Sequence, residues 1–168
     1  MAVLLVIHHC ATDNIKKLVD AALAGAHDPA IEGVDVNSVS ALAWATGKVD
    51  EVTLKRAHGY LFITPANFGY MSGALKHVFD STFLKIGGAL DEEGNPSNGG
   101  GGTRNRPYGV IVHGRYDTEG AVRSVESIAG ALGWKKAGTA VESLGEVTGE
   151  HLSAARELGG TLAALLMK

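Results

Sequence analysis

The chain has 168 residues, of which 45% are hydrophobic and 20% are charged, and its formal net charge is -3 at pH 7. This length and composition predict one globular domain over residues 1–168 with a sizeable core. The mild negative charge argues against a nucleic-acid partner and against an anionic membrane surface. The single cysteine, Cys10, excludes an internal disulfide and is typical of a reducing compartment, so we expect a cytoplasmic protein.

Apolar periodicity predicts strands that alternate with helices. The opening run Ala2–Ile7 is apolar throughout, as in a central parallel strand covered on both faces. It is too short for a membrane span and lacks the basic flank of a signal peptide, so we expect no membrane association. Further strands are predicted at Val34–Val39, Tyr60–Ile63, Tyr108–Val112 and Lys136–Val141. Helices are predicted at Ile15–Leu23, within Val49–Ala57, and at Ser72–Phe83, Val122–Leu132 and Leu152–Leu166, whereas Ala41–Gly47 is expected to be irregular.

The segment Ile86–Pro107 differs from the rest because glycine, proline and asparagine dominate it, including four successive glycines at Gly99–Gly102. It is longer than a routine connection in a compact domain. Two alternatives follow: a surface excursion, or a lid near the functional site that would bring Arg104 and Arg106 to a bound ligand.

The most informative stretch is Thr64–Asp80, which reads TPANFGYMSGALKHVFD. Pro65 offers no N–H and restricts Thr64, so these two residues are expected to end the strand. A short loop, Ala66–Tyr70, follows, and Ser72 is a suitable N-cap for the next helix. In a parallel α/β protein, such a strand–loop–helix unit places the loop at the carboxyl edge of the sheet, where ligands bind.

This stretch resembles the second flavin-binding loop of flavodoxin-like NAD(P)H-dependent oxidoreductases, which include FMN-dependent quinone reductases and NADPH-dependent FMN reductases. Their pattern is close to T-P-x-x-x-G-x-x-S-G-x-L-K-x-x-x-D. The residues that match it here are Thr64, Pro65, Gly69, Ser72, Gly73, Leu75, Lys76 and Asp80.

The resemblance implies an α/β flavodoxin-like fold: a three-layer αβα sandwich with a five-stranded parallel sheet in the order 2-1-3-4-5. The residues agree with this choice, because alternative doubly wound proteins carry signatures that are missing here. No G-x-G-x-x-G fingerprint follows the first strand, and no GK[ST] P-loop occurs.

The loop after the first strand opens onto a helix N-terminus, which favours anions through free N–H groups and the macrodipole. The resemblance implies that this loop holds the FMN phosphate, with Cys10, Thr12, Asn14 and Ile15 at the matching positions. Two departures are visible: Thr12 alone remains of the usual Ser/Thr pattern, and Asp13 replaces a usual glycine.

The two other loops of this edge would line the flavin ring. The second loop contributes Thr64, Pro65, Ala66, Asn67, Phe68, Gly69 and Met71. In it, Gly69 permits close backbone approach, and Phe68 or Tyr70 would pack on or beside the ring. The third loop contributes His113, Gly114, Arg115 and Tyr116. Arg115 would either stabilise negative charge near the reduced ring or be a solvated surface residue.

Other clusters of reactive side chains give weaker evidence for a functional site. His8, His9 and Cys10 are possible zinc ligands, but adjacent strand residues point to opposite faces and no second cysteine exists, so we predict no metal site. No acid partner for Cys10 is evident either, and we predict no catalytic side chain because the cofactor carries the redox chemistry.

The resemblance implies an FMN-dependent oxidoreductase that takes electrons from NAD(P)H and passes them to a quinone-like or other small-molecule acceptor. It also implies a homo-oligomer, either a dimer or a tetramer. Two alternatives stay open: a non-enzymatic flavodoxin-type electron carrier or FMN-binding protein, and a family member that no longer binds flavin, because of Asp13 and the altered third loop.

Overall fold

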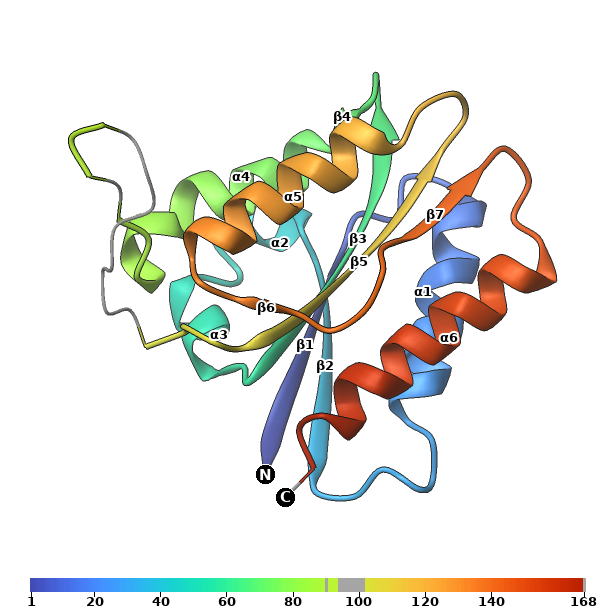
Figure 1. The fold of residues 1–168 in the computed structure, drawn as a ribbon, viewed down its shortest axis with the longest axis horizontal. Helices are drawn as coiled ribbons and strands as arrows, with labels where there is room; N and C mark the ends of the chain where they lie inside the picture. The colour runs from blue at the N-terminus through green and yellow to red at the C-terminus, as the bar shows by residue number, and fades with distance from the viewer. Residues whose placement is uncertain (90, 94–101, 168) are drawn as a thin grey trace.

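Strands and helices alternate along the chain (Figure 1), as the computed structural model shows for residues 1–89, 91–93 and 102–167. The strands are β1 (Ala2–His8), β2 (Val34–Ser40), β3 (Gly59–Asn67), β4 (Tyr70–Met71), β5 (Pro107–Gly114), β6 (Lys135–Lys136) and β7 (Val141–Leu144). The helices are α1 (Asp13–Ala26), α2 (Leu42–Ala45), α3 (Glu51–Arg56), α4 (Gly73–Thr82), α5 (Glu119–Ala131) and α6 (Gly149–Ala164), with a 3-10 helix, η1 (Phe83–Ile86).

The sheet has the order β2-β1-β3-β5-β6, and β7 also pairs with β5, nearer the carboxyl end of β5 than β6 does. Every pairing is parallel except that of the two-residue β4 with β3. The predicted flavodoxin-like order is therefore confirmed. The fifth strand differs from the prediction, because the single strand predicted at Lys136–Val141 is split into β6 and β7. Ala137 and Gly138 are poor strand formers and lie at the break.

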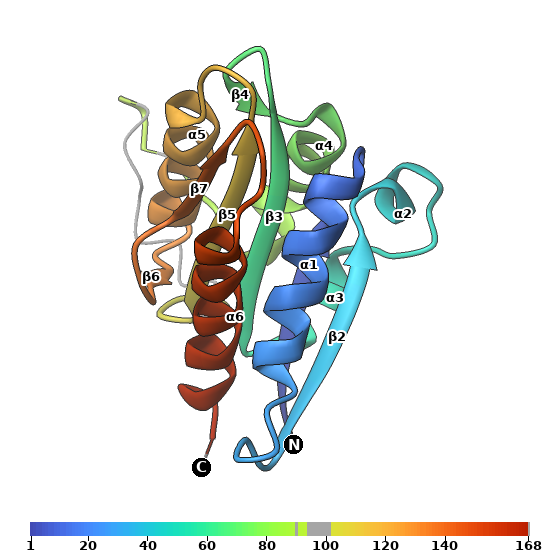
Figure 2. The same ribbon diagram turned by 90° about the vertical axis from the view of Figure 1, so that its right-hand side faces the viewer.

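Helices cover both faces of the sheet, which gives the three predicted layers (Figure 2). Leu4, Leu61 and Ile111 point to the face covered by α1 and α6. Tyr60 and Phe62 point to the opposite face, where they pack with the residues of α2 to α5. There the ring of Trp134 stacks on Tyr60, with 4.2 Å between the ring centroids. The alternation of buried side chains on β3 follows from the period of two along a strand.

The expectation that Thr64 and Pro65 end the third strand is wrong, because β3 continues to Asn67. The Ile63 carbonyl accepts the His9 N–H and therefore faces β1. Pro65 is two residues further on and faces the same side, beyond the last β1 residue paired with β3, His8. Its missing N–H thus costs no ladder hydrogen bond.

The segment Ala41–Gly47, expected to be irregular, contains the short helix α2. The side chain of Trp44 is only 6% exposed there and joins the core on the α4 and α5 face. Burial of this large side chain stabilises a helical turn that periodicity alone does not reveal.

The connection after α4 lies at the amino edge of the sheet, opposite the candidate site. The described ends of this connection are tied down: Thr103 Oγ1 donates to the Ile86 carbonyl at 2.9 Å and accepts from Trp134 Nε1 at 3.1 Å. Arg106 donates through Nη1 to the Tyr60 hydroxyl at 2.8 Å and to the Leu54 carbonyl at 3.0 Å. The alternative that brings Arg106 to a bound ligand is therefore wrong. Positions 90 and 94–101 of the predicted loop lie outside the described residues.

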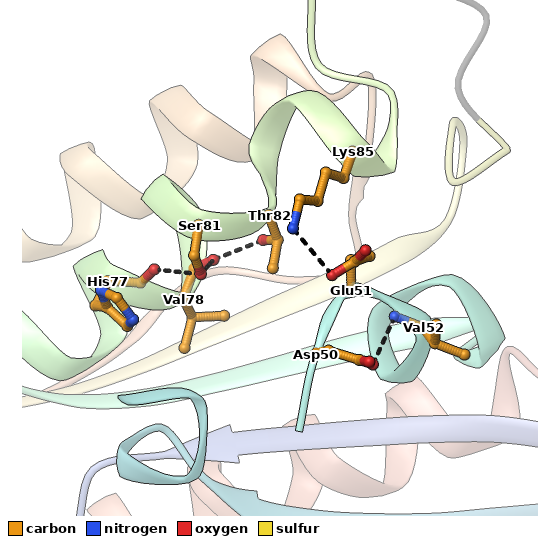
Figure 3. A network of polar contacts seen from close by, with 8 residues as sticks. All are labelled: Asp50, Glu51, Val52, His77, Val78, Ser81, Thr82 and Lys85. Atoms are coloured by element: carbon orange, nitrogen blue, oxygen red, sulfur yellow. Dashed lines mark hydrogen bonds and ion pairs between the residues drawn. The ribbon is translucent and has the colours of Figure 1, made fainter. Parts of the chain in front are cut away.

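The same end of the molecule carries a polar contact between η1 and α3 (Figure 3). Lys85 Nζ lies 3.3 Å from Glu51 Oε2, and Asp50 Oδ1 caps α3 by accepting the Val52 N–H at 3.0 Å. Exposed ion pairs of this kind contribute about 0.2–1 kcal/mol, so the contact fixes geometry more than stability. None of the helices in the described ranges has the length and apolar character to cross a membrane.

Candidate functional site

The carboxyl edge of the sheet brings together the three loops predicted from the sequence. Asn14 at the start of α1 meets His113 at the end of β5, with 3.4 Å between Nδ2 and Nε2. The second and third loops also touch, since a Cβ built on Gly114 would lie 3.1 Å from the Cβ of Ala66. Residues far apart in the sequence thus form one continuous rim, seen at the top of Figure 1.

The first loop presents unpaired backbone donors at the N-terminus of α1. Thr12 is the N-cap, and its Oγ1 accepts the Ile15 N–H at 3.4 Å. The backbone N–H groups of Cys10, Thr12, Asp13 and Asn14 have no hydrogen-bond partner among the described residues. Four free N–H groups at the positive end of a 14-residue helix can bind an anion.

One predicted residue of this loop, Ile15, contributes less than expected, and Asp13 is a departure from the family pattern. The side chain of Ile15 is fully buried, and its N–H is engaged by the Thr12 hydroxyl. The exposed carboxylate of Asp13 lies in the first turn of α1, where it interacts favourably with the macrodipole but competes with an incoming anion. Lys16 is held by Asp20 at 2.7 Å, and this hydrogen bond raises the pKa of Lys16.

His8 and Cys10 form a pair in the same loop, with 3.2 Å between Cys10 Sγ and His8 Nδ1. Burial, followed by the neighbouring His9, lowers the pKa of His8, whereas burial followed by Asp20 raises the pKa of the Cys10 thiol. The thiol therefore stays protonated at neutral pH beside the imidazole. This arrangement is the opposite of an activated cysteine nucleophile. The described residues contain no group of three His, Cys, Asp or Glu side chains placed to hold a metal ion.

The second loop is a tight hairpin. Ala66 pairs with Met71 and Asn67 with Tyr70, so Phe68 and Gly69 are its two turn residues. Both have positive φ, 52° and 75°, as a type I′ turn requires. This conformation is ordinary for glycine but unfavourable for phenylalanine. The Phe68 ring is fully exposed, so a strained residue displays an uncovered aromatic ring at the rim.

Much of the sequence motif serves to hold this hairpin. The Thr64 side chain is fully buried: Oγ1 accepts the Ser72 N–H at 3.0 Å and donates to the Pro65 carbonyl at 2.9 Å. Ser72 caps α4 by accepting the Leu75 N–H at 3.2 Å. The side chains of Thr64 and Met71 therefore face the interior, and of the residues of this loop predicted to contact the flavin ring, Asn67, Phe68 and Tyr70 are exposed.

The third loop is fixed by His113 and Asp117. His113 Nε2 lies 2.7 Å from the Gly145 carbonyl, which can only accept, so Nε2 carries a proton. Asp117 Oδ1 accepts the Glu119 N–H at 2.9 Å at the start of α5. Arg115 and Tyr116 are exposed, and their backbone N–H groups have no partner in the described part of the chain.

Three further residues shape the rim although the motif does not include them: Asp117, Gly120 and Gly145. A Cβ on Gly69 would lie 2.6 Å from Asp117 Oδ2, and a Cβ on Gly120 would collide with the Gly69 carbonyl. The hairpin tip thus packs directly on the first turn of α5. In the sequence, Gly120 itself could have indicated this contact, because glycine is unfavourable inside a helix and usually occurs there for a packing or functional reason.

The residues present fit FMN. The free N–H groups at the start of α1 suit a terminal phosphate, and the hairpin and the third loop offer an exposed ring and free amides for a flat polar ring system. The carboxylate of Asp13, in the first turn of α1, opposes the phosphate charge.

No protein-family model matches this sequence, and no curated protein matches it either. Solved structures of similar fold exist. A WrbA-like flavodoxin from Agrobacterium tumefaciens has a TM-score of 0.70 at 16% identity, over 99% of this chain and 98% of that one. A Streptococcus flavodoxin (strain TIGR4) has a TM-score of 0.71 at 19% identity, over 98% and 99%. An oxidoreductase from Corynebacterium diphtheriae has a TM-score of 0.64 at 17% identity, over 99% and 97%. These likenesses confirm the flavodoxin-like fold.

Proposed function

We propose that the chain is an FMN-dependent oxidoreductase that takes electrons from NAD(P)H and reduces a quinone-like or other small-molecule acceptor. The observation that carries the proposal is the run of unpaired N–H groups at Cys10, Thr12, Asp13 and Asn14, on the same rim as the exposed Phe68 hairpin. The similar structures support it, because they are flavodoxins and an oxidoreductase.

When bound, FMN would supply the redox chemistry, and the chain would supply position. The first loop would hold the phosphate through backbone N–H groups and the hydroxyl of Thr12. Asn67, Phe68 and Gly69 would line one side of the ring, and His113, Gly114, Arg115 and Tyr116 another. The hydrogen bonds of Thr64 to Ser72 and of His113 to Gly145 would keep both loops rigid. Rigid loops matter here because electron donor and acceptor must both stack closely on the ring.

The test is a titration of the purified protein with FMN and with riboflavin, followed by flavin fluorescence. We expect FMN to bind more tightly than riboflavin, because only FMN carries the phosphate. Asp13→Asn removes the opposing charge and should tighten FMN binding while leaving riboflavin binding unchanged. Absence of saturable FMN binding at high micromolar protein would overturn the proposal.

The enzymatic part needs a second measurement. Anaerobic addition of NADH or NADPH to the FMN-loaded protein should bleach the flavin absorbance band, and benzoquinone should restore it. If FMN binds but neither nicotinamide reduces it, the chain is a flavodoxin-type electron carrier and not an NAD(P)H oxidoreductase.

A further inference from the structure

His113 connects two loops of the rim through one ring nitrogen. Its Nε2 lies 2.7 Å from the Gly145 carbonyl, in the connection from β7 to α6, and 3.4 Å from Asn14 Nδ2, in the first turn of α1. The Gly145 N–H in turn donates to the Gly114 carbonyl at 2.9 Å, so Gly145 is bonded to the end of β5 through both of its backbone groups. The loop after β7 therefore holds the His113 ring in place beside Asn14.

The hydrogen-bond chemistry of this ring decides how the Asn14 amide is turned. A carbonyl can only accept, so His113 Nε2 carries a proton and donates to Gly145. The NH2 group of Asn14 is also a donor, and two donors that face each other make no hydrogen bond. The two ends of a carboxamide have nearly the same shape, so a half turn of the group brings Oδ1 beside the Nε2–H, where it accepts a share of that hydrogen bond. This orientation satisfies the carbonyl, the ring and the amide together.

The turned amide directs both N–H groups of Asn14 Nδ2 away from His113. The end of this side chain that points away from the ring has no hydrogen-bond partner among the described residues, so both N–H groups are free to bind a ligand. They belong to the same short segment as the unpaired backbone N–H groups of Cys10, Thr12 and Asp13. Side-chain and backbone donors that converge at one helix N-terminus suit the several oxygens of one phosphate group.

We propose that His113 is a positioning residue for the phosphate end of the flavin: anchored to Gly145, it fixes the Asn14 amide so that the NH2 group faces the phosphate. This role rests on the proposed function and deepens it, because the third loop then takes part in recognising the phosphate as well as the ring. An Asn14 side chain without this partner would rotate, and it would present its carbonyl oxygen, which repels a phosphate, as readily as its N–H groups.

The first measurement needs no flavin. Long-range proton–nitrogen NMR spectra of the flavin-free full chain, recorded at mildly alkaline pH, show which ring nitrogen of His113 carries the proton. We expect it on Nε2. Asn14→Asp should leave it there, because a carboxylate oxygen replaces Oδ1 as the acceptor. A proton on Nδ1 in the unmodified chain would overturn the proposal, whether or not the chain binds FMN.

Flavin titrations measure the effect on the ligand. His113→Leu removes the ring donor and should weaken FMN about two- to tenfold more than riboflavin, the effect of one side chain that must be ordered on binding. His113→Gln should restore the ratio of FMN to riboflavin affinity, because the glutamine NH2 group offers Gly145 and Asn14 a donor again. His77→Leu, at an exposed histidine of α4 whose ring makes no hydrogen bond to the described residues, is the matched control and should leave this ratio unchanged.

A double-mutant cycle shows whether His113 acts through Asn14. Asn14→Ala alone should weaken FMN relative to riboflavin by about tenfold. Adding His113→Leu to Asn14→Ala should then change the ratio no further, because the side chain that His113 holds is gone. Additive losses, or a His113→Gln protein no better than His113→Leu, would overturn the positioning role alone and leave the proposed function standing. Absence of FMN binding to the unmodified chain would overturn both.

Discussion

Gly159 of α6 lies directly against the carbonyl oxygen of Ala22 in α1. A Cβ built on Gly159 would come within 3.0 Å of that oxygen, closer than real Cβ atoms approach, and Gly25 meets Arg156 across the same interface in the same way. The two helices that cover one face of the sheet therefore touch backbone to backbone. This close approach requires glycine at both positions.

Gly159→Ala should lower the free energy of unfolding by about 1–3 kcal/mol, because the added methyl forces the helices apart and overpacks the core. Urea unfolding followed by circular dichroism measures it. Gly130→Ala in α5 is the matched control, since a Cβ there meets nothing within 4 Å. That control should stabilise the protein by about 0.5–1 kcal/mol through helix propensity alone. Equal effects of the two substitutions would contradict the backbone contact.

Phe68→Asn should raise the free energy of unfolding by about 1 kcal/mol, since asparagine tolerates the positive φ of 52° better than phenylalanine does. The Phe68 ring is exposed, so little packing is lost. If FMN binds as proposed, the same substitution should weaken riboflavin and FMN binding alike, because it would remove the proposed ring contact and leave the proposed phosphate contacts in place. A destabilised Phe68→Asn protein would show that the turn is unstrained.

Arg106→Gln should lower stability by about 1–3 kcal/mol, because the buried Leu54 carbonyl and Tyr60 hydroxyl lose a donor. Burial raises the pKa of Tyr60, so its hydroxyl stays neutral and continues to donate to Leu54. The KM for NADH and NADPH should be unchanged, because Arg106 lies at the amino edge of the sheet. A raised KM for NADPH alone would instead place the nicotinamide phosphate at Arg106.

Stability should fall on acidification below pH 6.5 through His8. Its pKa is lowered from 6.5, mainly by burial, so the unfolded chain binds the proton more readily than the folded protein. The contribution of neutral His8 to the free energy of unfolding is complete above the pKa that His8 has in the unfolded chain. It is lost as the pH falls toward the pKa that His8 has in the folded protein. His8→Gln should flatten this part of the pH profile of urea unfolding. An unchanged slope would assign the pH dependence to other groups.

The strand order could be predicted because the alternation of strands and helices leaves few parallel topologies, and the resemblance carried by Thr64–Asp80 selects one of them. The end of β3 was predicted wrongly. Whether the missing N–H of Pro65 costs a hydrogen bond depends on where the neighbouring strand β1 ends, and the local sequence does not show this. The helix α2 was missed because it is stabilised by burial of Trp44 and not by periodicity. The break between β6 and β7 was missed because a single glycine is a weak local signal.

The candidate site was predicted at the level of loops better than at the level of side chains. The three loops meet as expected, because parallel strands carry their carboxyl ends to one edge. Thr64, Ile15 and Met71 turn inward, however, since motif residues that support a loop look the same in sequence as residues that touch a ligand. The oligomeric state and the cytoplasmic location stay predictions.

The anchored ends of the connection after α4 have a consequence for protein engineering. Thr103 joins Ile86 and Trp134, and Arg106 joins Leu54 and Tyr60, all at the end of the sheet away from the rim. Ends that are held together by their own hydrogen bonds tolerate changes of length between them, since loop closure entropy grows only slowly with length. The interval between these anchors is therefore a place to insert a fluorescent reporter or a second domain while the opposite edge keeps its shape.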